Sequence, residues 1–206
     1  MYIIGITGGV GCGKSEVLSY LRDRWEFRVM ELDRIGHTML LPGSPCFDRV
    51  CDLFGPSVLR PDGTIDRGAV ASLVFRDEAL LGELNAIVHP AIRDEAVSQL
   101  GQLAEAGTAF CAVEAALLLE VKFDALCDET WYIYADTDVR KRRLAASRGY
   151  SEERIRSMME RQLDEQVFRS RCGTVIDNSG DLLSTREQID GRMREILSSL
   201  KGTLET

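Results

Sequence analysis

Long apolar runs are absent from this sequence. None approaches the roughly 20 residues that a membrane-spanning helix needs, so we expect no interaction with a membrane. The first residues, Met1–Gly5, lack the basic segment and apolar stretch of a secretory signal, which argues against export. Histidine is also scarce. The two residues, His37 and His89, have no cysteine at ligand spacing, so we expect no zinc site.

Paired cysteines are missing as well. The sequence has six cysteines, with no CxxC pair and no regular framework of the kind that disulfide-rich domains show. They are Cys12, Cys46, Cys51, Cys111, Cys127 and Cys172. In a chain of this size such residues are typical of free thiols in a reducing compartment. We therefore expect a cytoplasmic protein in which most of them fill the core.

Basic residues are fewer than acidic ones. The 25 lysines and arginines are outnumbered by 33 aspartates and glutamates, and the net charge is −8. Proteins that bind nucleic acid generally carry a basic surface, so this balance argues against a nucleic-acid partner. An anionic ligand is still compatible with the sequence, because arginines are concentrated between Arg140 and Arg171.

The residues that are present alternate between short β-rich runs and helical segments. The expected strands are residues 2–7, 27–32, 109–113, 130–135 and 174–177. This alternation predicts an α/β fold, a three-layer core around a mainly parallel five-stranded sheet. Residues 35–106 are helical in pattern and too numerous for one crossover connection, so they predict a helical lobe inserted into the core.

One segment carries a specific chemical motif. Gly8-Gly9-Val10-Gly11-Cys12-Gly13-Lys14-Ser15 fits G-x-x-x-x-G-K-[ST] at every fixed position, between an apolar strand and an amphipathic helix. Glycines let backbone N–H groups turn inward around phosphate oxygens, and the start of the following helix adds its positive dipole end. Lys14 supplies a charge for the β- and γ-phosphates, and the Ser15 hydroxyl can bind Mg²⁺. The motif predicts binding of a nucleoside triphosphate with magnesium.

Nucleotide binding alone leaves several classes of protein open. The base-reading signature Asn/Thr-Lys-x-Asp of signalling GTPases is absent, and the chain is too short for a motor or helicase core. A small-molecule kinase fits the inserted lobe and the late arginines best. The alternatives are another nucleoside or nucleotide kinase, and a binding or regulatory protein that holds nucleotide without turnover.

Further motifs carry a family resemblance. The segment from Ile4 to Ser15 closely resembles the opening of dephospho-coenzyme A kinases. Matches to the same family follow in order along the chain, from Ile3 to about Asp181. They are Asp33 with Arg34-Ile35-Gly36-His37, then Asp62–Arg67, Leu73-Val74-Phe75, Leu84–Ile92 with His89-Pro90, Leu117-Leu118-Leu119-Glu120, an arginine-bearing segment with Gln162, and Val175–Gly180.

The resemblance implies an activity and an organisation. The family transfers the γ-phosphate of ATP to the ribose 3′-hydroxyl of dephospho-CoA, the last step of coenzyme A synthesis. We expect one P-loop kinase domain over residues 1–206, with its core at 1–35, 107–135 and 172–206. The helical acceptor-binding insertion would be residues 36–106, and a lid over ATP would be residues 138–170. The implied partners are ATP, Mg²⁺ and dephospho-CoA, for a monomer or weak homo-oligomer.

The resemblance also assigns catalytic residues. Asp33 is the candidate general base, just beyond the expected second strand, where open α/β sheets bind ligands. It could equally orient the attacking hydroxyl, or cap a helix. Glu114, after the third strand, could hold a magnesium-bound water. The chain departs from the family where Glu31-Leu32-Asp33 replaces Asp-x-Asp and where Ala116 replaces a proline.

Three residues are expected to contact the acceptor. His89 precedes Pro90 at an expected break between helices, where it could instead satisfy a helix end. Arg67 could bind substrate or form a turn salt bridge with Asp66. Glu120 is expected at the mouth of the acceptor site.

The remaining candidates face ATP. Lid arginines suit phosphate oxygens, with Arg148 the catalytic candidate and either Arg142 or Arg143 its companion. Asn178 lies in a loop that resembles the family's adenine-side loop. The alternative is that this segment is an ordinary Asn/Gly turn. Cys12 is expected to contribute its backbone, with a redox role for its thiol as the lesser alternative.

Overall fold

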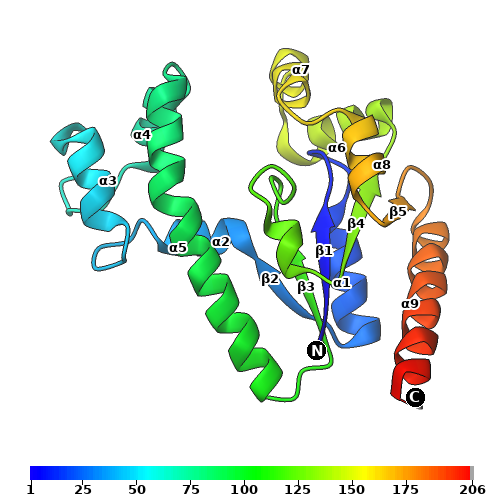
Figure 1. Cartoon of the computed structure of the whole chain (residues 1–206). Coiled ribbons are helices and arrows are strands. Elements are labelled where there is room, and N and C mark those ends of the chain that lie inside the picture. Colours follow the sequence, from blue (N-terminus) through cyan, green and yellow to red (C-terminus); the bar gives the residue numbers. More distant parts are fainter. Residues whose placement is uncertain (205–206) are drawn as a thin grey trace. The chain divides into compact units, whose positions relative to one another are not determined.

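The computed structural model describes residues 1–204, without the side chains of Arg148, Thr203 and Leu204. The chain divides into two compact units (Figure 1). The core unit comprises residues 1–29 and 109–206, and the helical unit comprises residues 30–108. No helix in the described range is both long enough and apolar enough to cross a membrane.

A five-stranded sheet has the strand order β2-β3-β1-β4-β5. Its strands are β1 (Tyr2–Thr7), β2 (Arg28–Glu31), β3 (Phe110–Glu114), β4 (Glu129–Tyr134) and β5 (Thr174–Asp177). The central strand β1 runs parallel to β3 and β4, and β4 runs parallel to β5. Parallel pairing places the carboxyl ends of these strands at one edge of the sheet, where α/β proteins bind their ligands. The predicted α/β fold with a parallel five-stranded sheet is confirmed.

Helices cover both faces of the sheet in the core unit. Its helices are α1 (Lys14–Trp25), the short η2 (Phe123–Leu126), α6 (Thr137–Arg148), α7 (Glu152–Glu160), α8 (Glu165–Arg171) and α9 (Leu182–Leu204). On one face, Ile4, Ile6 and Ile133 pack with buried residues of α1 and α9. On the other face, Tyr132 stacks on Phe168 of α8 with ring centroids 4.7 Å apart. Alternation along β4 therefore decides which helix each side chain meets.

The helical unit is built on one long helix. Its elements are α2 (Leu32–Thr38), α3 (Phe47–Phe54), the short η1 (Pro56–Val58), α4 (Arg67–Val74) and α5 (Glu78–Glu105). Helices α2, α3 and α4 all pack against α5. Gly36 of α2 comes close to Ile92 of α5, where a β-carbon would lie 3.1 Å from the Ile92 Cδ1 atom. Asp66 caps the start of α4 by accepting hydrogen bonds from the backbone N–H groups of Gly68 and Ala69.

The second strand is shorter than the sequence predicted. We expected residues 27–32, but β2 comprises Arg28–Glu31. Phe27 instead completes the turn that ends α1, donating its backbone N–H to the Leu21 carbonyl at 3.3 Å after a left-handed Glu26. Leu32 already begins α2, so Asp33 lies in the first turn of a helix rather than in the coil after a strand.

The expected helix break at His89-Pro90 does not occur. Helix α5 runs without interruption through Pro90, with His89 half-buried inside it. Proline removes one backbone donor from the helix, which packing can outweigh. Ile92, Ala96 and Leu100 recur every fourth residue as the buried face of α5, and their burial holds the helix together beyond the proline.

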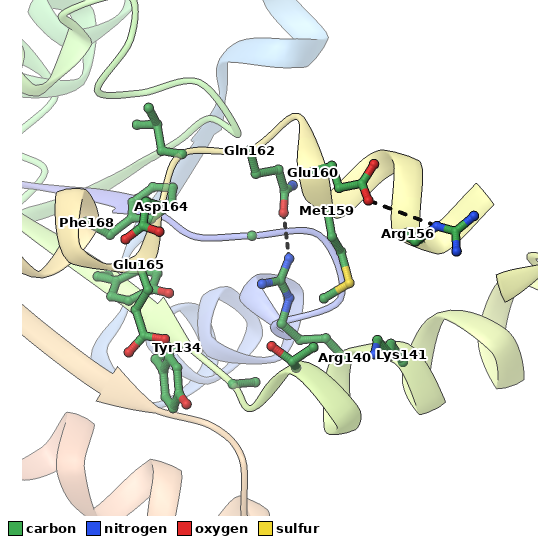
Figure 2. Close-up of a pocket in the computed structure, with 15 residues that line it drawn as sticks. Tyr134, Arg140, Lys141, Arg156, Met159, Glu160, Gln162, Asp164, Glu165 and Phe168 are labelled. Atoms are coloured by element: carbon green, nitrogen blue, oxygen red, sulfur yellow. Dashed lines mark hydrogen bonds and ion pairs between the residues drawn. The ribbon is translucent and has the colours of Figure 1, made fainter. Parts of the chain in front are cut away.

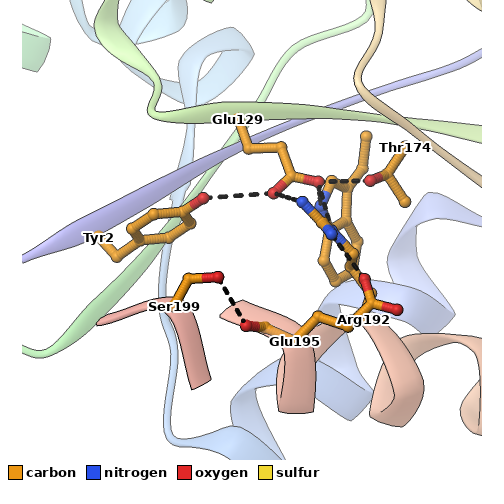
Figure 3. Close-up of polar contacts among 7 residues, drawn as sticks. Tyr2, Glu129, Thr174, Arg192, Glu195 and Ser199 are labelled. Carbon is orange, nitrogen blue, oxygen red and sulfur yellow. Dashed lines mark hydrogen bonds and ion pairs between the residues drawn. The ribbon is translucent and has the colours of Figure 1, made fainter. Parts of the chain in front are cut away.

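A buried carboxylate joins β1, β4, β5 and α9 at the amino end of β4 (Figure 3). The Glu129 side chain is 7% exposed and accepts two hydrogen bonds from Arg192, at 2.9 and 2.8 Å. It also accepts hydrogen bonds from Tyr2, Trp131 and Thr174. Burial alone would raise the pKa of Glu129, but the bonds from Arg192 and Thr174 outweigh it and lower the pKa. The carboxylate therefore stays ionised and structural.

Glu129→Gln should lower the free energy of unfolding at pH 7 by about 1–3 kcal/mol, because Arg192 loses its buried charged partner. A carboxyl group with a lowered folded-state pKa stabilises the fold above its unfolded pKa of about 4.3 and stops doing so as the pH falls through the folded value. The difference between variant and wild type should therefore shrink below about pH 4. Urea unfolding across pH measures it.

Glu195→Gln is the matched control for this measurement. Glu195 also bonds Arg192, at 2.6 Å, but its side chain is 67% exposed. Exposed ion pairs contribute about 0–1 kcal/mol, so this variant should unfold almost like the wild type. Equal losses for the two variants would contradict the assignment of Glu129 as the buried partner.

Candidate active site

The phosphate loop connects β1 to α1. Gly8, Gly11 and Gly13 all have positive φ angles, which glycine adopts without steric cost. Gly13, at φ 91°, is the residue before α1, so the loop turns directly into the helix amino terminus. Free N–H groups and the positive end of the helix dipole are thereby presented at one point, which is the geometry that binds phosphate.

Lys14 and Glu114 meet beside this loop. Lys14 Nζ donates a hydrogen bond to the Gly8 carbonyl at 3.0 Å and lies 3.6 Å from Glu114 Oε1. Both side chains are mostly buried, with 15% and 13% of their surface exposed. Glu114 is the last residue of β3 and Ser15 is the second residue of α1. Hydroxyl and carboxylate oxygens are ligands that suit Mg²⁺, and the residues present fit that ion.

Asn178 supports the loop from the carboxyl end of β5. Its side chain is 1% exposed and donates to the Cys12 carbonyl at 2.8 Å, while its Oδ1 accepts from Thr185 at 2.9 Å. A β-carbon at Gly13 would overlap the Asn178 amide. The Asn178 side chain thus contacts the phosphate loop itself.

Arg143 lies against the same part of the loop. Its guanidinium donates to the Cys12 carbonyl at 3.3 Å and to the Asn178 carbonyl at 2.9 Å. Arg142 is exposed and bonds the Asp138 carbonyl of its own helix. Of the two neighbours that the sequence left open, Arg143 is the one that the structure brings to the phosphate loop. The side chain of Arg148 lies outside the described part of the chain.

The Cys12 thiol is part of the hydrophobic core. It is 1% exposed and packs with residues of β1, α1 and β4. Burial raises the pKa of this thiol despite the nearby Lys14. A protonated, inaccessible sulfur is a poor nucleophile, which favours the structural interpretation of Cys12 over the redox alternative.

Arg140 is a contact that the sequence analysis did not single out. It lies on α6 and donates from Nε to the Val10 carbonyl at 2.8 Å. The available signal was helical spacing, because Arg140 and Arg143 are three residues apart and therefore share one face of α6. Leu144, buried on that face, also approaches Gly11 of the loop.

A cavity of about 460 Å³ lies beside Gly9 between α6, α7 and α8 (Figure 2). Aromatic residues Tyr132, Tyr134 and Phe168 form part of its wall. The charged groups around it are largely paired within the protein, as with Arg156 and Glu160 at 4.0 Å. Helices α6, α7 and α8 each contribute residues to its wall.

In the helical unit, two predicted site residues lie near His37. They are Asp33, on α2 with His37, and Arg67 of α4. Arg67 hydrogen-bonds the Nε2 atom of His37, and both side chains are exposed. Burial and the Arg67 charge lower the pKa of His37, while Asp33, four residues earlier on α2, opposes this shift. A neutral His37 can accept the Arg67 hydrogen bond. The i, i+4 spacing from Asp33 could have pointed to His37 in the sequence.

The other predicted acceptor contacts lie on separate elements. His89 is half-buried on α5, and burial lowers its pKa, so its ring is neutral at pH 7. Asp66 forms an ion pair with Arg60 at 3.5 Å as well as capping α4, so the turn salt bridge expected with Arg67 is made with Arg60. Glu120 is exposed in the turn that follows β3, in the core unit.

A phosphate loop between a parallel strand and a helix, with its lysine and serine in place, defines a P-loop kinase. The sequence profile described as Dephospho-CoA kinase matches residues 2–184. The chain belongs to the dephospho-CoA kinase family, which phosphorylates dephospho-CoA with ATP in the final step of coenzyme A biosynthesis.

Individual relatives agree with this assignment. A dephospho-CoA kinase of Symbiobacterium thermophilum is 38% identical over 194 residues, covering 94% of this chain and 81% of the relative. One of Carboxydothermus hydrogenoformans is 38% identical over 191 residues, covering 91% and 90%. A crystal structure of a Thermus thermophilus protein superimposes with a TM-score of 0.82 at 31% identity, covering 97% of both chains.

Proposed function

We propose that this chain transfers the γ-phosphate of ATP to the 3′-hydroxyl of the ribose in dephospho-CoA, giving CoA and ADP. The observation that carries the proposal is the geometry of the phosphate loop, where Lys14 donates to the Gly8 carbonyl and α1 begins directly after Gly13. Membership of the dephospho-CoA kinase family names the acceptor.

The donor half would be built by the core unit. Backbone N–H groups of Gly8–Ser15 would bind the phosphate oxygens, and Lys14 would offset the charge of the β- and γ-phosphates. Ser15, and Glu114 through a water molecule, would hold Mg²⁺, which neutralises phosphate charge when bound. Arg143 and Arg148, within the proposed lid at residues 138–170, would contact the phosphate oxygens of ATP. Asn178 would position its loop on the base side of ATP.

The acceptor half would be supplied mainly by residues 36–106. Arg67 and His89 would contact dephospho-CoA, together with Glu120 of the core unit. Asp33 would accept the proton of the attacking hydroxyl or orient it while the new oxygen–phosphorus bond forms and the bond to the leaving ADP oxygen breaks. Since such transition states are loose, positioning carries much of the rate.

We further propose that the protein works in the cytoplasm as a monomer or weak homo-oligomer, with no membrane or nucleic-acid partner. The six cysteines are all unpaired in the structure, which supports a reducing compartment. The acidic net charge of −8 supports the absence of a nucleic-acid partner.

The activity can be tested with Mg·ATP and a panel of acceptors. We expect ADP and a 3′-phosphorylated product with dephospho-CoA, and little turnover with adenosine, shikimate or gluconate. Product identity is read by mass spectrometry and by digestion with a 3′-nucleotidase. Turnover of a plain nucleoside without turnover of dephospho-CoA would show that the chain is a different small-molecule kinase.

A further inference from the structure

Two side chains of the lid region hold both backbone polar groups of Val10. Val10 donates its N–H to Gln162 Oε1 at 3.2 Å, and its carbonyl accepts a hydrogen bond from Arg140 Nε at 2.8 Å. Arg140 also donates to Gln162 Oε1, at 2.5 Å. The two side chains point toward one another, Arg140 from α6 and Gln162 from the segment after α7 (Figure 2). We call this triangle of contacts the Val10 clamp.

The clamp fixes the orientation of two consecutive peptide groups of the phosphate loop, because the Val10 N–H belongs to the Gly9–Val10 peptide and its carbonyl to the Val10–Gly11 peptide. The N–H groups of such a loop generally turn toward phosphate oxygens, whereas the Val10 N–H donates to the Gln162 side chain. Both partners are separated from Val10 by at least 130 residues in sequence. The loop conformation at Val10 therefore depends on where α6 and the end of α7 lie.

Gly9 provides independent support for the clamp. A β-carbon at Gly9 would overlap the Arg140 guanidinium, so the arginine packs directly on the loop backbone. Gly9 is not among the glycines with positive φ, unlike Gly8, Gly11 and Gly13. Its lack of a side chain thus serves the approach of Arg140 rather than the local backbone conformation.

We propose that Arg140 and Gln162 are positioning residues for phosphoryl transfer, which couple the lid helices to the phosphate loop through Val10. Two of the five Arg140 N–H donors bond to Val10 and Gln162, and we assign the effect of Arg140 on the phosphates to these two bonds. Because transfer depends on sub-ångström alignment of donor and acceptor, loosening the clamp slows the chemical step more than it weakens ATP binding. This inference rests on the proposed kinase function.

Gln162→Met keeps the length of the side chain and removes the acceptor oxygen. We expect kcat with dephospho-CoA to fall about 10- to 100-fold, while the KM for ATP changes less than about 3-fold. Hydrogen exchange of the Val10 amide, followed by NMR, should become at least about 10-fold faster. Gln166→Met, on an exposed position of α8, is the matched control and should leave all three quantities unchanged.

Arg140→Lys and Gly9→Ala disturb the clamp from its other two sides. Each variant alone should lower kcat as Gln162→Met does. Each double variant with Gln162→Met should lower kcat by less than about a further 3-fold, because the groups act as one unit. Fully multiplicative losses would contradict the clamp. Arg142→Lys, an exposed neighbour on α6, is the matched control for the arginine.

The outcomes separate this inference from the proposed function. The clamp is overturned if the Val10 amide exchanges at the wild-type rate in Gln162→Met, whichever acceptor the enzyme uses. It is also overturned if that variant keeps the wild-type kcat. A wild-type protein that uses another acceptor overturns the proposed function, and the same measurements on that acceptor still decide the clamp. Faster exchange together with slower turnover supports it.

Discussion

Replacing Lys14 by methionine should lower kcat/KM for dephospho-CoA phosphorylation by about 10³-fold. The structure holds the Lys14 ammonium at the loop, 3.0 Å from the Gly8 carbonyl and 3.6 Å from Glu114. A preorganised charge in a mostly buried site stabilises the transferring phosphoryl group without reorganisation during the reaction. Methionine keeps the length of the side chain and removes the charge. Steady-state assays of ADP formation measure the effect.

Lys141→Met is the matched control for this prediction. Lys141 lies on α6, is 53% exposed and pairs only weakly with Asp138 at 3.7 Å. The control should keep turnover within about 2-fold of the wild type, since exposed pairs contribute little. Thermal unfolding checks that Lys14→Met is folded. A folded Lys14→Met protein with normal turnover would falsify the assignment of the donor site.

Asp33→Asn should abolish most transfer while leaving ATP binding intact. We expect kcat to fall about 10²- to 10⁴-fold, the usual contribution of a general base, because the amide cannot accept the proton of the acceptor hydroxyl. Asp33 is exposed in the first turn of α2, so the substitution should not affect folding. Calorimetric binding of ATP and assays with dephospho-CoA separate the two effects.

The pH profile distinguishes the two roles open to Asp33. A base that takes the proton gives kcat an acid limb that disappears in Asp33→Asn, whereas a positioning group leaves the shape of the profile unchanged. Asp52→Asn, at an exposed position of α3 in the same unit, is the matched control. Normal turnover by Asp33→Asn would remove the residue from the mechanism altogether.

Much of the fold could be predicted because its signals are local. The strands Tyr2–Thr7 and Thr174–Asp177 have the predicted bounds, and β3 and β4 are displaced by one residue. The ends of the helices were harder to predict from the sequence. Phe27 has strong β-propensity, but the backbone hydrogen bond that closes α1 places it outside the strand. Pro90 is a helix breaker by propensity, and the packing of α5 overrides it.

The sequence by itself determined the phosphate loop, because its eight motif residues are consecutive and their backbone conformations follow from glycines and a helix start. The family motifs likewise named the acceptor. Tertiary structure alone decided that Arg143 rather than Arg142 reaches the phosphate loop, that the Asn178 side chain is buried beneath it, and that Arg140 and Gln162 hold Val10. These contacts join residues more than 100 positions apart, and side-chain direction at such separations is set by the packing of whole helices.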